Sequence, residues 1–130
     1  MDLGALVAVV LGGVLVGLAD WLFGGVLFHD KYMAYPEVWR PRDTNRYAIA
    51  IAQVLAFVTA LAFVLIAQRF ALTDFSQTFT LALLLWIMAP VPILITNAAF
   101  MKLHPLVVAS NTVGWLVKLL ALAFVTALFL

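Results

Sequence analysis

The chain of 130 residues contains no cysteine and few charged residues, which make up only 10% of the sequence. The lack of cysteine excludes disulfide bonds, thiolate metal sites and cysteine nucleophiles. Soluble domains have about a quarter of their residues charged. A soluble fold of this size also has too little interior to bury a sequence that is 67% hydrophobic. These deficits indicate an integral membrane protein.

Catalytic and nucleic-acid-binding features are also lacking. The sequence has no GxSxG, HExxH, P-loop or GxGxxG motif, so it predicts that the protein is not an enzyme. A net charge of only +1 argues against nucleic acid as a partner. Asp2 is the one charged side chain before the first apolar run, where a signal peptide would carry Lys or Arg. We therefore expect that run to be a retained helix.

Four apolar stretches are long enough to cross a bilayer as helices, which takes about 20 residues each. Short connections between successive helices favour antiparallel neighbours, so the expected fold is an all-α, up-down four-helix bundle. The bundle would form a single domain over residues 1–130. Thr44 and Asn45 are candidate N-caps of the second helix, and Thr73 and Asp74 of the third. The predicted spans are residues 4–28, 46–67, 76–100 and 105–130.

Basic residues are divided unevenly between the two sides of the predicted bundle. The side with loops 29–45 and 101–104 has five of them, whereas the side with both termini has only Arg69. Because cytoplasmic loops are enriched in Lys and Arg, we expect these two loops in the cytoplasm and both termini outside. The expected location is the bacterial inner membrane. The five residues are Lys31, Arg40, Arg42, Arg46 and Lys102, and Tyr32, Tyr35, Trp39 and Tyr47 fit an aromatic belt on that side.

Glycines in the first predicted helix share a face with a charged residue. Gly13, Gly17, Asp20 and Gly24 recur at helical spacing. Gly13 and Gly17 form a GxxxG pair, which lets another helix approach closely. We expect this face to pack inside the bundle, with a dimer interface as the alternative.

Two charged residues lie within the predicted spans, where a charge is costly and usually faces a partner or a cavity. Asp20 and Asn111 are at nearly the same depth, about 10 Å from the cytoplasmic ends of their helices. The side chain of Lys118 leans back towards that level because helical side chains point to the N-terminus. We therefore expect an intramembrane cluster of Asp20, Asn111 and Lys118. It would be a structural ion pair, a proton- or substrate-binding carboxylate, or a contact with another protein.

Two prolines interrupt the third predicted helix. Pro90 and Pro92 each remove a backbone donor, so a kink is expected near mid-membrane. Broken helices often line cavities, although kinks without function are also common. Thr96 and Asn97 follow the kink and are candidates for hydrogen bonds between helices.

Two histidines lie at the predicted cytoplasmic ends of the first and last helices. His29 and His104 would ligate a metal or haem only if these helix ends were neighbours. They lack a third strong ligand and a recognisable spacing, so the sequence predicts no cofactor and no metal.

Most of the chain resembles a known family in the positions of its glycine, tryptophan and proline residues. Their order resembles that of a family of small four-span bacterial membrane proteins of unknown function. The resemblance implies the architecture and adds no chemistry, because the family has no established activity. At Asp20 the family pattern would have an apolar residue or tryptophan, so the resemblance does not extend to that position. It is carried by Gly17-Leu-Ala-Asp-Trp21-Leu-Phe23-Gly24 and by Trp86, Pro90 or Pro92, Asn97, Phe100, Asn111 and Gly114-Trp115.

Two functions remain open from the sequence. The first is a non-enzymatic accessory subunit that binds a partner helix or a hydrophobic ligand within a larger membrane complex. The expected partners are then the lipid bilayer and other membrane helices, in a homo-oligomer or a larger assembly. The second is a small proton-coupled transporter using Asp20, since small multidrug transporters also carry an acidic residue in the first of four helices. A haem- or metal-binding bundle is a third and weaker alternative.

Overall fold

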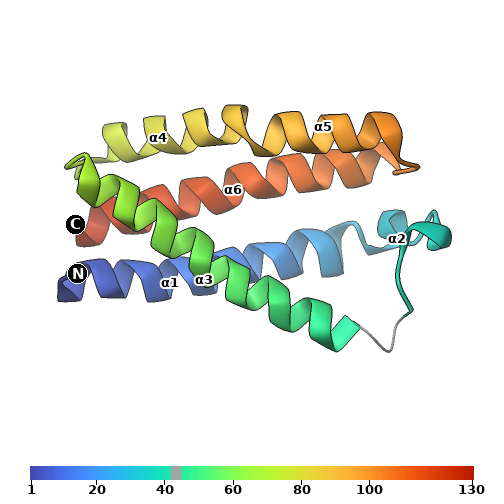
Figure 1. Cartoon of the computed structure of the whole chain (residues 1–130), viewed down its shortest axis with the longest axis horizontal. Helices are drawn as coiled ribbons and strands as arrows, with labels where there is room; N and C mark the ends of the chain where they lie inside the picture. The colour runs from blue at the N-terminus through green and yellow to red at the C-terminus, as the bar shows by residue number, and fades with distance from the viewer. Residues whose placement is uncertain (42–44) are drawn as a thin grey trace.

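The structure is a computed structural model, and it describes residues 1–41 and 45–130. The described residues form helices and no strand, which confirms the predicted all-α class. Figure 1 shows the long helices lying side by side, with a short helix at one end. In chain order the elements are α1 (Leu3–Asp20), a π-helix η1 (Trp21–Leu27), α2 (His29–Tyr32), a 3-10 helix η2 (Pro36–Val38), α3 (Asn45–Arg69), α4 (Phe75–Met88), α5 (Pro90–Phe100) and α6 (Pro105–Phe129).

Four helical stretches are long and apolar enough to cross a membrane, so the chain is a multi-pass membrane protein. They match the predicted spans to within two residues at each end. Arg42 and Thr44, which the sequence predicted to be a cytoplasmic charge and an N-cap, lie outside the described residues. The stretches are Leu3–Leu27, Asn45–Arg69, Phe75–Phe100 and Pro105–Phe129.

The antiparallel helices α1 and α6 form the centre of the bundle. α3 packs on α1, and α4 and α5 pack on α6. Both termini lie at one end, together with the turn between α3 and α4, as Figure 1 shows. Gly4 permits the close approach of the two ends, because a Cβ there would collide with the carbonyl oxygen of Phe129. The up-down order predicted from the short loops is therefore correct.

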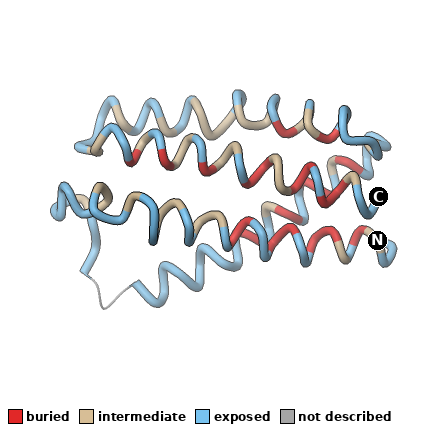
Figure 2. Tube along the Cα trace, turned by 180° about the vertical axis from the view of Figure 1, so that it is seen from behind, coloured by how far each residue is buried: buried red, intermediate tan, exposed pale blue. Residues whose placement is uncertain are grey.

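The packed core lies mostly in the half of the bundle that holds the termini. Figure 2 shows the buried residues concentrated there, whereas the opposite half is largely exposed. In α3, small residues at helical spacing, including Ala56, Ala60 and Ala67, are fully or almost fully buried. Residues 45–55 of the same helix are all exposed. The first half of α3 thus diverges from the other helices, as Figure 1 shows in green.

The break between α4 and α5 falls at Ala89, with φ −124° and ψ −69°, which confirms the predicted kink. Pro90 and Pro92 lack the N–H groups that would bond to the carbonyls of Trp86 and Met88 in a continuous helix. The backbone resumes directly, because the Ile93 N–H donates to the Ala89 carbonyl at 3.0 Å. The proline pair therefore bends the span without ending it.

Side-chain caps fix three helix starts. The Asp74 carboxylate accepts from the Gln77 N–H at 2.8 Å, and the Gln77 side chain accepts from the Thr73 N–H at 3.0 Å. This reciprocal pair confirms the predicted cap of α4. Asp2 caps α1 by accepting from Ala5 at 2.8 Å, a role the sequence analysis did not assign. The Nδ1 atom of His104 likewise accepts from Leu106 at the start of α6.

A seven-residue π-helix, η1, follows Asp20 and has no counterpart in the sequence prediction. π-helical segments are rare and are frequent at functional sites. The segment contains Gly24 and Gly25, whose missing side chains reduce crowding in a wider turn. Because its periodicity differs from 3.6 residues per turn, η1 changes which residues of the first span face the neighbouring helices.

Candidate functional site

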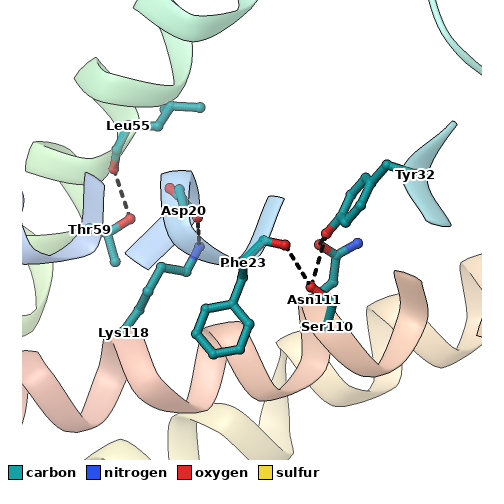
Figure 3. A network of polar contacts seen from close by, with 8 residues as sticks. All are labelled: Asp20, Phe23, Tyr32, Leu55, Thr59, Ser110, Asn111 and Lys118. Carbon is teal, nitrogen blue, oxygen red and sulfur yellow. Dashed lines mark hydrogen bonds and ion pairs between the residues drawn. The ribbon is translucent and has the colours of Figure 1, made fainter. Parts of the chain in front are cut away.

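An ion pair joins the two central helices within the predicted bilayer region. The Nζ atom of Lys118 on α6 donates to Oδ1 of Asp20 at 2.6 Å. Figure 3 shows the two side chains pointing toward one another from α1 and α6. The structure thus brings together two of the three residues in the predicted cluster. Their antiparallel helices meet at matching depth, and the lysine side chain spans the remaining distance.

The two charges differ in exposure. The Lys118 side chain is 8% exposed, whereas that of Asp20 is 39% exposed. The ammonium also lies over the Trp115 ring, 3.7 Å from its centroid. A cation on an aromatic face is attracted to the ring, most strongly where water is excluded. Lys118 is therefore enclosed by protein, while the carboxylate of Asp20 faces open space.

A second polar group lies next to the ion pair. The hydroxyl of Tyr32 on α2 donates to Oδ1 of Asn111 at 2.5 Å and lies 3.4 Å from Oγ of Ser110. Ser110 in turn donates to the backbone carbonyl of Phe23 in η1, at 3.1 Å. Figure 3 shows this set of contacts connecting α2, α6 and η1. Asn111, expected beside Asp20 and Lys118, instead takes Tyr32 as its hydrogen-bond partner.

Both polar groups border one cavity of about 330 Å³. This volume is within the usual range for small-molecule sites. Asn111 therefore shares a cavity with Asp20 and Lys118, as expected, even though its bond is to Tyr32. The cavity is lined by Ala19, Asp20, Phe23, Gly24, Tyr32, Leu94, Ser110, Asn111, Gly114, Trp115 and Lys118.

Tyr32 is the site residue that sequence reasoning placed only in an interfacial belt. Burial raises the pKa of its phenol above the ordinary value of 10.0; the Ser110 hydrogen bond lowers the pKa, and the negative charge of Asp20 raises it. The phenol is thus a hydrogen-bond donor at neutral pH. Ser110 and Asn111 are polar neighbours near the start of an apolar helix. This pair is the sequence feature that could have indicated a polar partner such as Tyr32.

The glycines of the first helix fall into two groups. A Cβ at Gly13 would collide with the Phe57 ring, and one at Gly17 would lie 2.6 Å from Oε1 of Gln53. Both therefore pack against α3, as predicted. The prediction for Gly24 is wrong, because a Cβ there would meet nothing within 4 Å. Gly24 lies in η1, where the α-helical spacing that linked it to the other two no longer holds.

The kink of the third span borders a second cavity, which is apolar and about 320 Å³ in volume. Pro90 lines it together with Leu94 and Trp115. Pro92, Thr96 and Asn97 are exposed and do not line this cavity. Within the described part of the chain, neither Thr96 nor Asn97 makes the predicted hydrogen bond between helices.

The two histidines lie in different surroundings. His104 caps α6 through Nδ1, whereas His29 lines a separate cavity on the α3 side. Among the residues that the structure describes, no group of three or more His, Cys, Asp or Glu side chains is placed to hold a metal.

A groove of about 660 Å³ lies between the first half of α3 and the η1–α2 segment and is here called the α3 groove. Residues 45–55 on its α3 side are all exposed, although Gln53 still contacts α1 at Gly17. Gly24 and Tyr32 line both this groove and the polar cavity, so the two spaces adjoin at η1. The lining residues are Gly24, His29, Tyr32, Met33, Trp39, Arg40, Asn45, Ala48, Ile49 and Ala52.

Comparison with known proteins identified no relative of this chain. A scan against protein-family models, a search of curated proteins and a search of solved structures each found no match. The functional conclusions below therefore rest on the residues of this chain.

Proposed function

We propose that the protein is a non-enzymatic accessory subunit that binds another membrane helix or a hydrophobic ligand in the bacterial inner membrane. The observation that carries this proposal is the α3 groove. Protein interiors are closely packed, so a space of about 660 Å³ beside a diverging helix is suited to an occupant. Every residue from 45 to 55 on that helix is exposed, so α3 offers this surface to a molecule outside the chain.

The orientation and the family are parts of the same proposal. The end with Lys31, Arg40, Arg46 and Lys102 would face the cytoplasm, and both termini would face outward. We also propose that the protein belongs to the family of small four-span bacterial membrane proteins that its sequence resembles. The four long apolar helices support this, because the family has four membrane spans.

Native mass spectrometry of the protein, gently extracted from its own membrane, tests this proposal. We expect a defined assembly with another membrane protein or a retained lipophilic molecule. Filling the α3 groove by Ala52→Phe should release the bound species. Ala62→Phe is the matched control, because Ala62 is also exposed on α3 but does not line the groove. A chain that carries neither protein nor ligand would contradict the proposal.

Proton-coupled transport is the second candidate, favoured by the exposed carboxylate of Asp20 on the polar cavity. The Lys118 ion pair opposes it, since a proton or substrate would have to compete with the ammonium. Liposomes with an imposed pH gradient and tetraphenylphosphonium as the probe cation would test this function. Uptake that is lost in Asp20→Asn and kept in Asp74→Asn would support transport, and no uptake by the unmodified protein would argue against it.

A further inference from the structure

We propose that the α3 groove binds one anionic phospholipid. Its phosphate would lie at Arg40 and His29, and an acyl chain would follow the apolar surface of α3. This inference rests on the proposed function and names the class of ligand. It follows from the charge of the groove, its gradient of polarity and the position of one glycine.

Among the residues that the structure describes, the basic side chains lining the groove are His29 and Arg40, and no described Asp or Glu lines it. Arg40 is exposed and makes no ion pair within the described part of the chain. Asp30 and Glu37, described acidic residues close to His29 and Arg40 in sequence, do not line the groove, and Asp43 lies outside the described residues. The exposed guanidinium of Arg40 makes the described part of the mouth complementary to a phosphate, which arginine binds through paired hydrogen bonds.

Polarity decreases along the groove. Asn45 lies at its mouth with Arg40, and Ala48, Ile49 and Ala52 follow on α3. The step from Asn45 to Ala52 is seven residues, or about 10 Å along the helix. Such a gradient matches a lipid, whose charged head stays at the interface while its chain enters the apolar region.

Aromatic side chains form the wall on the α2 side of the mouth. Trp39 and Tyr32 have ring centroids 5.7 Å apart, and the indole N–H of Trp39 donates to the Tyr32 backbone carbonyl. Trp and Tyr are enriched at the level of lipid headgroups. In the proposed orientation this end lies in the cytoplasmic leaflet, which carries anionic lipids. The wall is thus held in place at the depth where a phosphate would bind.

Gly24 provides room on the η1 side. It lines the groove, and a Cβ at this position would meet nothing within 4 Å, so a larger side chain would occupy the space of the acyl chain. Gly25 is its matched neighbour, because it lies in the same π-helix but does not line the groove. A Cβ at Gly25 would instead contact the Trp21 ring at 3.5 Å.

A second membrane helix is the competing occupant. A helix would bring its charges into the groove only at the cost of placing them near or within the bilayer. A phospholipid presents its negative charge at the interface without that cost. The positive mouth above an apolar floor therefore favours the lipid.

Native mass spectrometry in detergent with equal amounts of phosphatidylglycerol and phosphatidylethanolamine tests the inference. The unmodified protein should retain one phosphatidylglycerol in preference to phosphatidylethanolamine. Arg40→Gln should lower this preference by roughly three- to tenfold, since one charge-assisted contact is lost. Arg69→Gln is the control, because Arg69 is an exposed arginine at the opposite end of α3.

Steric variants complete the experiment. Gly24→Leu should abolish retention of both lipids, whereas Gly25→Leu should leave it unchanged. Ala52→Phe fills the groove from the α3 side and serves if Gly24→Leu does not fold, as judged by circular dichroism. Equal effects of Arg40→Gln and Arg69→Gln, or equal retention of the two lipids, would overturn the inference.

The outcome also separates this inference from the proposed function. If Ala52→Phe releases a co-purified membrane protein but no variant alters lipid retention, the inference fails and the proposed function stands. If the unmodified protein retains neither a lipid nor a protein, both fail.

Discussion

Asp20 and Lys118 respond differently to loss of their partner because they differ in burial. Asp20→Asn would leave a buried ammonium without its counterion, which costs of order 3 kcal/mol. Lys118→Met should cost less, because the remaining carboxylate faces the polar cavity and keeps access to water or a proton. Denaturant unfolding of each variant in detergent measures both effects.

The double variant provides the control for this prediction. Because Asn and Met together leave no unpaired charge, Asp20→Asn with Lys118→Met should be more stable than Asp20→Asn alone. If the two single effects simply add, or if Lys118→Met proves the more damaging change, the ion pair does not act as described.

Tyr32 gives the site a pH dependence in the alkaline range. Burial raises the pKa of the phenol, so the folded state holds the proton more tightly than the unfolded state. Its contribution to stability is therefore fully present below pH 10 and is lost as the pH rises through the folded pKa. The phenolate absorbance of the unmodified protein minus that of Tyr32→Phe should show a midpoint above 10.0. A midpoint at or below this value would show that the phenol is not buried in solution.

At the scale of elements, the irregular helical segments coincide with the cavities. η1 borders both the polar cavity and the α3 groove, and the break at Ala89 borders the apolar cavity. The regular halves of α1 and α3, by contrast, pack closely through Gly13, Gly17 and small alanines. Departures from regular α-helix thus border the spaces in which a ligand can lie, and regular helix forms the packed end of the bundle.

The turn after α3 contains a strained residue that a single substitution should relieve. Ala71 has φ +54°, and the Leu72 N–H closes the helix end by donating to the Ala67 carbonyl at 2.8 Å. This geometry favours glycine, so Ala71→Gly should stabilise the protein by roughly 0.5–1 kcal/mol. Thermal unfolding in detergent would measure the gain.

A second alanine on the same helix gives the opposite expectation. Ala62 is exposed within regular α3, where replacement by glycine costs about 1 kcal/mol. Ala62→Gly should therefore lower the unfolding temperature while Ala71→Gly raises it. A loss of stability in both would mean that the turn does not hold Ala71 at positive φ.

For the whole molecule, the uneven charge of the two ends predicts the direction of insertion. The chain has no cysteine, so single cysteines can be introduced without background labelling. In intact cells, an impermeant maleimide should label Thr73→Cys, in the turn after α3, and should not label Ala34→Cys or Met101→Cys until the membrane is opened. The reverse pattern would place the basic end outside and contradict the proposed orientation.

The sequence by itself determined the features that depend on local properties. Span length and hydropathy set the four helices, proline chemistry set the bend at Ala89, and the Asp74–Gln77 spacing set the cap of α4. The meeting of Asp20 and Lys118 was also predictable. Two charges in apolar helices of known direction have few other partners, and their depths follow from the rise per residue.

Only the tertiary structure decided which face of each helix meets a neighbour. Apolar residues surround these helices on all sides, so hydropathy does not fix their rotation about the long axis. That rotation gave Asn111 the hydroxyl of Tyr32 as its hydrogen-bond partner. No residue pattern predicted the π-helix η1. Because of η1, Gly24 lines a cavity and does not pack against a neighbouring helix as the α-helical spacing had predicted. The divergence of α3 beside the groove likewise depends on contacts between helices and not on the sequence of any one of them.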